Sequence, residues 1–218
     1  MDDLNTLGKY FYNCRLQPSA SKTEVACFHL NNRMANRELS VNFGNRLLHH
    51  NRYPKYLGVT FDRTLSFKQH LTKTASKLKT RNNIIQKLCG TSWGSSATTL
   101  RCSALGLVYS TAEYCAPVWL NSPHANMVDV QLNHTMRLIS GTIRSTPSHW
   151  LPVLSHFPPP SIPRSIALVR EYNKVLQNPQ LLINADIEDI GRNRLRSRKR
   201  SIRTATNLAT AAFNPIND

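Results

Sequence analysis

The spacing of apolar residues along the chain changes near Phe61. Before it, most apolar residues lie in short runs that alternate with polar neighbours or are rich in β-branched and aromatic side chains, which predicts strands. After it, they recur at intervals of three and four residues, which predicts helices. The sequence therefore predicts an α+β chain in which a small antiparallel sheet is followed by a helical bundle and a basic tail.

The predicted sheet region opens with a helix, because four apolar residues share one helical face: Leu4, Leu7, Phe11 and Cys14. Thr23–Leu30 predicts a strand that is buried on both faces. Gly44-Asn45 predicts a hairpin turn, and the hairpin together with a strand over Tyr56–Phe61 predicts a three-stranded sheet. Gly58 within that last strand fits a close backbone approach, a bulge or simple packing.

A turn over Asp62–Ser66, with Ser66 as the N-cap, leads into the first long helix. The apolar positions of this helix are Leu71, Ala75, Leu78, Ile85 and Leu88. We expect a buried central helix through Leu100–Cys115, in which Glu113 takes an ion-pair or rim position. A third helix over His124–Ser140 follows, closed by Gly141.

The rest of the chain predicts two further segments. Thr146–Pro160 is rich in proline and predicts a stiff, extended connector. The apolar spacing over Ile166–Leu176 predicts one more helix, ending before Pro179.

The charge balance narrows the choice of partners. The 218 residues include 28 Lys and Arg against 12 Asp and Glu, for a formal charge of +16. A charge of this size favours nucleic acid first and an anionic membrane second. No apolar run is long enough for a membrane span and no secretory signal is recognisable, so we expect an intracellular protein, in a cytoplasmic ribonucleoprotein or the nucleus. Five cysteines without a C-x-x-C pair favour free thiols.

Basic residues gather on the first long helix, at Lys73, Lys77, Arg81 and Lys87. A soluble helix usually mixes in acids for pairing, yet none occurs between Asp62 and Glu113. A solvated face and a grip on a phosphate backbone are both compatible with this pattern, and the clustering favours the grip.

A second basic run lies near the C-terminus, within Arg192–Arg203. Its candidate nucleic-acid contacts are Arg192, Arg194, Arg196, Arg198, Lys199 and Arg200. Phosphate binding, a nuclear-import signal and a merely solvated run all remain open. No aromatic residue lies within the run, which argues against sequence-specific single-strand readout.

Three boxes give the chain a specific resemblance. Lys55-Tyr-Leu-Gly-Val-Thr-Phe-Asp62 is similar to the K-Y-L-G-V-x-L-D primer-grip box of reverse transcriptases of jockey-like non-LTR retrotransposons. Pro18–Glu24 is similar to their N-P-x-K-T-x box, and Ala112–Trp119 resembles their E-Y-x-x-P-V-W thumb box. The order and spacing of the boxes also match, and the likeness extends from about Leu4 to about Pro160.

The resemblance implies four regions: the end of a polymerase palm with the primer-grip hairpin over residues 1–62, a helical thumb over 63–145, the proline-rich connector over 146–160, and a C-terminal helix with the basic tail over 161–218. It also implies that Lys55, Tyr56, Leu57 and Gly58 hold the primer end. Lys22 would lie near the triphosphate, although an ordinary solvent lysine fits its position equally well.

The resemblance does not extend to the metal-binding box of the polymerase. Asp2 and Asp3 adjoin a predicted helix, where acids favour the N-terminal dipole, and they stand too close to Pro18 for that box. We therefore expect no catalytic or metal-binding residue and no cofactor in this fragment. Mg²⁺ is expected only for an intact polymerase.

Two function classes follow. The chain is either the C-terminal part of a retrotransposon RNA-directed DNA polymerase, inactive by itself, or a stand-alone RNA- or DNA-binding protein without catalysis. A helical protein–protein adaptor is a third interpretation. The expected partners are primer and template nucleic acid and, where present, the upstream half of the same polymerase, with neither a membrane nor a small-molecule cofactor.

Overall fold

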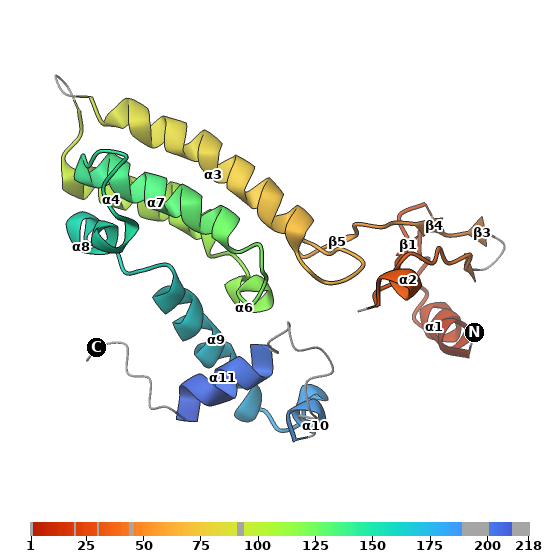
Figure 1. Cartoon of the computed structure of the whole chain (residues 1–218). Helices are drawn as coiled ribbons and strands as arrows, with labels where there is room; N and C mark the ends of the chain where they lie inside the picture. The colour runs from red at the N-terminus through yellow and green to blue at the C-terminus, as the bar shows by residue number, and fades with distance from the viewer. Residues whose placement is uncertain are drawn as a thin grey trace. The chain divides into compact units, whose positions relative to one another are not determined.

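A computed structural model describes residues 2–19, 21–29, 31–43, 46–90, 94–188 and 201–210. The chain divides into two compact units, Met1–His70 and Leu71–Asp218, so the division falls inside the first long helix. Helices and small two-stranded sheets make up the described residues, which confirms the α+β class (Figure 1).

The described residues of the first unit form two helices and six short strands, apart from the first turn of α3 (Lys68–Leu88). These are α1 (Asp2–Asn13), β1 (Glu24–Val25), α2 (Asn32–Ala35), β2 (Asn42–Phe43), β3 (Arg46–Leu47), β4 (His49–His50), β5 (Lys55–Tyr56) and β6 (Val59–Thr60). They pair as β1 with β4, β2 with β3, and β5 with β6. β2 and β3 pair antiparallel, with Phe43 opposite Arg46. The turn predicted at Gly44-Asn45 itself lies outside the described residues.

The predicted three-stranded antiparallel sheet is wrong, since each sheet found among the described residues has two strands and the β1–β4 pair is parallel. The buried strand over Thr23–Leu30 is also wrong, because only Glu24–Val25 is extended and Glu24 is exposed. A strand buried on both faces needs a layer on each side. In the described part of this unit, β1 pairs with β4 alone, and its second residue, Val25, is only half-buried.

The strand predicted over Tyr56–Phe61 is a hairpin instead. Leu57 and Gly58 have φ angles of 45° and 83°, and Tyr56 pairs with Val59 across them. A two-residue turn with two positive φ angles reverses the chain and matches the twist of the flanking strands. Gly58 is thus a turn glycine, and the β-branched residues Val59 and Thr60 fill the buried strand behind it.

The second unit is helical. It contains most of α3 (Lys68–Leu88), then α4 (Ala97–Ala104), the π-helix η1 (Leu105–Tyr109), α5 (Ser110–Ala112), α6 (Ala116–Trp119), α7 (Asn126–Ser140), the 3₁₀ turn η2 (Ser148–Trp150), α8 (Leu151–Ser155), α9 (Ser161–Leu176), α10 (Ile183–Glu188) and α11 (Ser201–Thr210). The third helix is confirmed, and Gly141 closes α7 with a φ of 65°.

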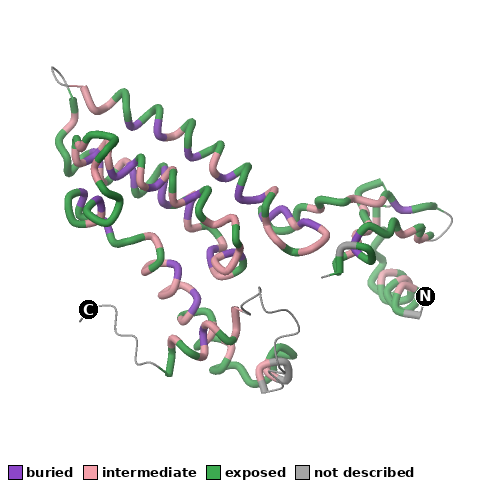
Figure 2. The backbone as a smooth tube through the Cα atoms, viewed as in Figure 1, coloured by how far each residue is buried: buried purple, intermediate pink, exposed green. Residues whose placement is uncertain are grey.

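Helices α3 and α7 lie along each other in the same chain direction. Leu71, Leu78 and Ile85 are fully buried, and Figure 2 shows the buried positions of α3 repeating along one side of the helix. Asn82 occupies the same buried side: its amide donates to the carbonyl of Gln131 at 3.0 Å and accepts from the Thr135 hydroxyl at 2.7 Å. These bonds fix the rotation and the register of α3 against α7.

The central segment is only partly the buried helix that was predicted. It runs from α4 through the π-helix to α5, and Val108 and Ala112 are buried. Leu105 and Leu107 are exposed, because the wider π turn shifts the apolar positions away from the spacing of an α-helix.

The extended connector predicted over Thr146–Pro160 is also wrong. It folds as η2 and α8, which packs against α7 and buries Leu151 and Phe157. Pro152 lies in the first turn of α8, where a proline loses no helical hydrogen bond.

The C-terminal segments confirm one predicted helix and add another. The structure confirms α9, against which α11 packs. The helix α11 was not predicted from the apolar spacing, although Ala205 at its centre is buried.

Arg164 ties α9 to two other segments. Its guanidinium contacts Glu113 at 3.2 Å and Asp129 at 2.6 Å and lies 4.8 Å from the ring centre of Trp119. The ion-pair role expected for Glu113 is confirmed. Since Arg164 is buried, removing either of its carboxylates would leave a charge poorly compensated.

The α3–α7 hydrogen bonds give a stability prediction. Asn82→Leu should lower the free energy of unfolding by about 1–3 kcal/mol, because the Gln131 carbonyl loses its buried donor. Denaturant titration measures this change, and Asn83→Leu at the exposed neighbouring position is the control, with an expected effect within about 0.5 kcal/mol. Equal losses in both variants would contradict the proposed role of Asn82.

Candidate nucleic-acid interface

The outward face of α3 carries a cluster of unpaired cations. Lys73, Lys77 and Lys87 are exposed and lie opposite the buried row of the same helix. α3 contains no acid, and none of the ion pairs found within the described residues involves these lysines. We call these three residues the α3 lysine row. The structure thus places three of the four predicted α3 cations on an open face.

Arg81 has a different position from the other three cations. It is half-buried, and its guanidinium donates to the carbonyl of Leu107 in the π-helix and to the Thr111 hydroxyl. These contacts hold α3 against the η1–α5 segment. Arg81 therefore has a structural role that the charge pattern did not reveal.

The primer-grip residues predicted from the sequence form the tip of the β5–β6 hairpin. Lys55, Tyr56, Leu57 and Gly58 are all exposed, and Tyr56 and Leu57 keep 67% and 71% of their surface accessible. Such a projecting tip can contact a partner with its backbone and with large apolar side chains.

The other residues considered in the sequence lie in a turn, at a helix N-terminus or outside the described residues. Lys22 is exposed in the turn after Ser19, whose carbonyl accepts from the Lys22 amide at 3.1 Å. Asp2 and Asp3 begin α1, as expected for acids at a helix N-terminus. The basic residues from Arg192 to Arg200 lie outside the described residues.

Asp62 organises the turn between β6 and α3. Its carboxylate accepts from the backbone amides of Ser66 at 2.7 Å and Lys68 at 3.1 Å, and from the hydroxyls of Ser66 and Thr64. Ser66 was the predicted N-cap, but its hydroxyl lies 3.4 Å from the Lys68 amide. Asp62 thus provides the shorter cap for the first amide of α3.

The environment of Asp62 affects its ionisation in two opposing ways. Burial by itself raises the pKa of this carboxyl, but the hydrogen bonds from Ser66, Thr64 and Lys68 outweigh it and hold the pKa below its ordinary value. The ionised form is therefore favoured in the folded unit.

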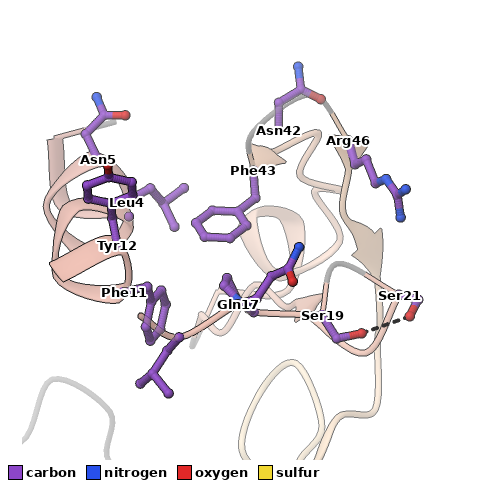
Figure 3. Close-up of a pocket in the computed structure, with 13 residues that line it drawn as sticks. Leu4, Asn5, Phe11, Tyr12, Gln17, Ser19, Ser21, Asn42, Phe43 and Arg46 are labelled. Atoms are coloured by element: carbon purple, nitrogen blue, oxygen red, sulfur yellow. Dashed lines mark hydrogen bonds between the residues drawn. The ribbon is translucent and has the colours of Figure 1, made fainter. Parts of the chain in front are cut away.

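A groove of about 900 Å³ lies between α1 and the β2–β3 hairpin (Figure 3). The ring of Phe43 points toward α1 and Leu4, and Phe11 and Tyr12 also line the groove. Arg46 is the one charged residue among those found to line it. The strand and helix patterns could not predict this groove, because it depends on how the two elements approach each other.

No family model matches this chain, and no curated protein or solved structure matches it significantly. Within the described residues, no helix is long and apolar enough to cross a membrane.

The capping turn gives a pH-dependent prediction. Because the pKa of Asp62 is depressed in the folded state, its stabilisation is present above the unfolded pKa of about 4 and is lost as pH falls through the folded value. Asp62→Ala should cost about 1–3 kcal/mol at neutral pH. Denaturant titrations from pH 7 to strongly acidic pH should show the difference from the unmodified chain shrinking below about pH 4. A pH-independent difference would contradict a role for the ionised carboxylate.

Proposed function

We propose that the chain is the palm-end and thumb part of a jockey-like reverse transcriptase and that it binds primer–template nucleic acid through the outward face of α3. The α3 lysine row, exposed and without acids on its helix, is the observation that carries the proposal. The three sequence boxes supply the family, and the geometry of α3 supports the binding role.

The lysine row suits a phosphate backbone for a physical reason. Lys73 and Lys77 are four residues apart, which places their Cβ atoms about 6 Å from each other on the helix surface. Like charges at this spacing repel and destabilise the free helix, whereas a bound polyanion compensates them and releases counterions.

The fixed orientation of α3 within the helical unit also favours binding. Three fully buried apolar residues and the buried Asn82 fix the side of the helix that faces outward. The lysines therefore do not need to be ordered by a rotation of the whole helix during binding, which lowers the entropy cost of association.

The exposed β5–β6 tip supports the primer-grip assignment. Its Leu57-Gly58 turn is exposed, together with the side chains of Tyr56 and Leu57, and an exposed turn of this kind can approach the end of a nucleic-acid strand closely. Polymerase chemistry is no part of the proposal, because the boxes recognised here do not include the metal-binding one.

The interface is tested by reversing the charge of two lysines. Lys73→Glu combined with Lys77→Glu should weaken binding to a nucleic-acid duplex at least tenfold, or about 1.4 kcal/mol. The fold should remain intact, because both side chains are exposed. Fluorescence anisotropy with a labelled primer–template duplex measures the affinity.

The matched control is Arg170→Glu with Lys174→Glu, two exposed basic residues with the same spacing on α9. It changes the net charge equally and should weaken binding much less. Full affinity of the α3 double variant at physiological salt, or an equal loss in both double variants, would contradict a specific interface on α3.

A further inference from the structure

A second groove, of about 520 Å³, runs between α3 and α7 within the helical unit. Its lining consists of Thr72, Ala75, Ser76 and Lys79 from α3, and of Pro123, His124, Asn126, Met127, Val130 and Gln131 from α7 and the segment before it. Among these residues, only Ala75 has a role predicted from the sequence, as an apolar position of the first long helix. The groove lies on a different side of α3 from the lysine row.

The chemistry of the groove is mixed but contains no acid. The lining residues found include hydroxyl, amide and imidazole groups together with apolar side chains, and Lys79 supplies a cation. α7 has one acid, Asp129, whose carboxylate lies 2.6 Å from the buried Arg164 guanidinium and does not line the groove. Neither wall therefore presents a carboxylate that would repel an anion.

We propose that this groove holds the sugar–phosphate backbone of a nucleic-acid strand, mainly through neutral hydrogen bonds. This inference rests on the proposed function and specifies a second contact surface for it. Phosphate oxygens would accept from Ser76, Asn126 and Lys79, while the apolar surfaces of Met127 and Val130 would contact the carbon atoms of the sugar.

A nucleic-acid strand fits this lining better than a peptide does. An apolar helix would bury the polar groups of the groove without partners, which is unfavourable. An acidic peptide could pair with Lys79, but its carboxylates lie only on its acidic side chains and are not part of its backbone. A nucleic acid presents both acceptor oxygens and sugar carbons along its whole length, which suits a lining that contains both hydrogen-bond donors and apolar side chains.

The groove and the lysine row should differ in their salt dependence. Each phosphate neutralised by a lysine contributes a slope of about 0.7–0.9 to the dependence of log affinity on log salt, since counterions are released. Neutral hydrogen bonds release none, so loss of the groove should lower the affinity while reducing the slope by no more than the one contact of Lys79.

The test fills the groove without changing the charge. Ser76→Phe, from the α3 wall, and Val130→Phe, from the α7 wall, should each weaken binding to a labelled primer–template duplex at least fivefold and lower the salt slope by no more than the one contact of Lys79. Asn83→Phe, an exposed α3 position outside the lining, is the matched control and should bind normally. Lys79→Gln should reduce the slope by about one contact.

The outcomes separate this inference from the proposed function. Normal binding by both filled variants would overturn the groove while leaving the lysine row intact. Loss of binding in the Asn83→Phe control would also overturn the groove proposal, because a large side chain outside the groove would then have the same effect as one inside it. Displacement of the nucleic acid by polyglutamate from the unmodified chain but not from Ser76→Phe would assign the groove to acidic peptides. The absence of any duplex binding by the unmodified chain would instead reject the proposed function itself.

Discussion

The buried amide of Asn82 is the interaction on which the proposed nucleic-acid interface depends. It replaces an apolar side chain in the middle of the α3 core row and bonds to α7 both as donor and as acceptor. Apolar contacts alone tolerate small rotations and sliding of a helix, whereas a buried amide is satisfied only in one register. Because α3 cannot rotate, the lysine row, Arg81 and the α3–α7 groove each keep a defined direction.

The Arg164 cluster completes this arrangement from the other side of α7. One buried guanidinium serves two carboxylates, and burial raises the pKa of Glu113 even though Arg164 opposes the shift. Burial also raises the pKa of the nearby Tyr109 phenol, whose ring stacks on Phe157 at 4.4 Å. The cluster holds α9 in place and engages Asp129, the one acid of α7, away from the groove. The ion pair with Arg164 thus keeps the Asp129 carboxylate away from the α3–α7 groove, where Lys79 is the charged residue among those found in the lining.

The long helices were predictable because their apolar spacing extends over many turns, as in α3, α7 and α9. The strands were not, because a run such as Tyr56–Phe61 is compatible with one strand or with a tight hairpin, and only the positive φ at Leu57 and Gly58 distinguishes them. The burial of Asn82 could not be predicted from the sequence, because polar residues in a helix are expected on its surface. The structural roles of Arg81 and Arg164, and both grooves, depend on tertiary contacts that spacing does not encode.

The two units differ in how far their own residues account for their stability. The helical unit has fully buried rows in α3 and α7, whereas the first unit contains two-stranded sheets with two residues per strand. Isolated pairs of this kind are marginally stable in water. Exposed Leu16, Leu47 and Tyr53 add apolar surface to the first unit. In the proposed role, further palm strands would cover this surface and extend the short sheets.

The Asp62 cap would then do more than begin α3: it would keep the β5–β6 tip in a fixed relation to the first turn of that helix, even where the sheets themselves are weak.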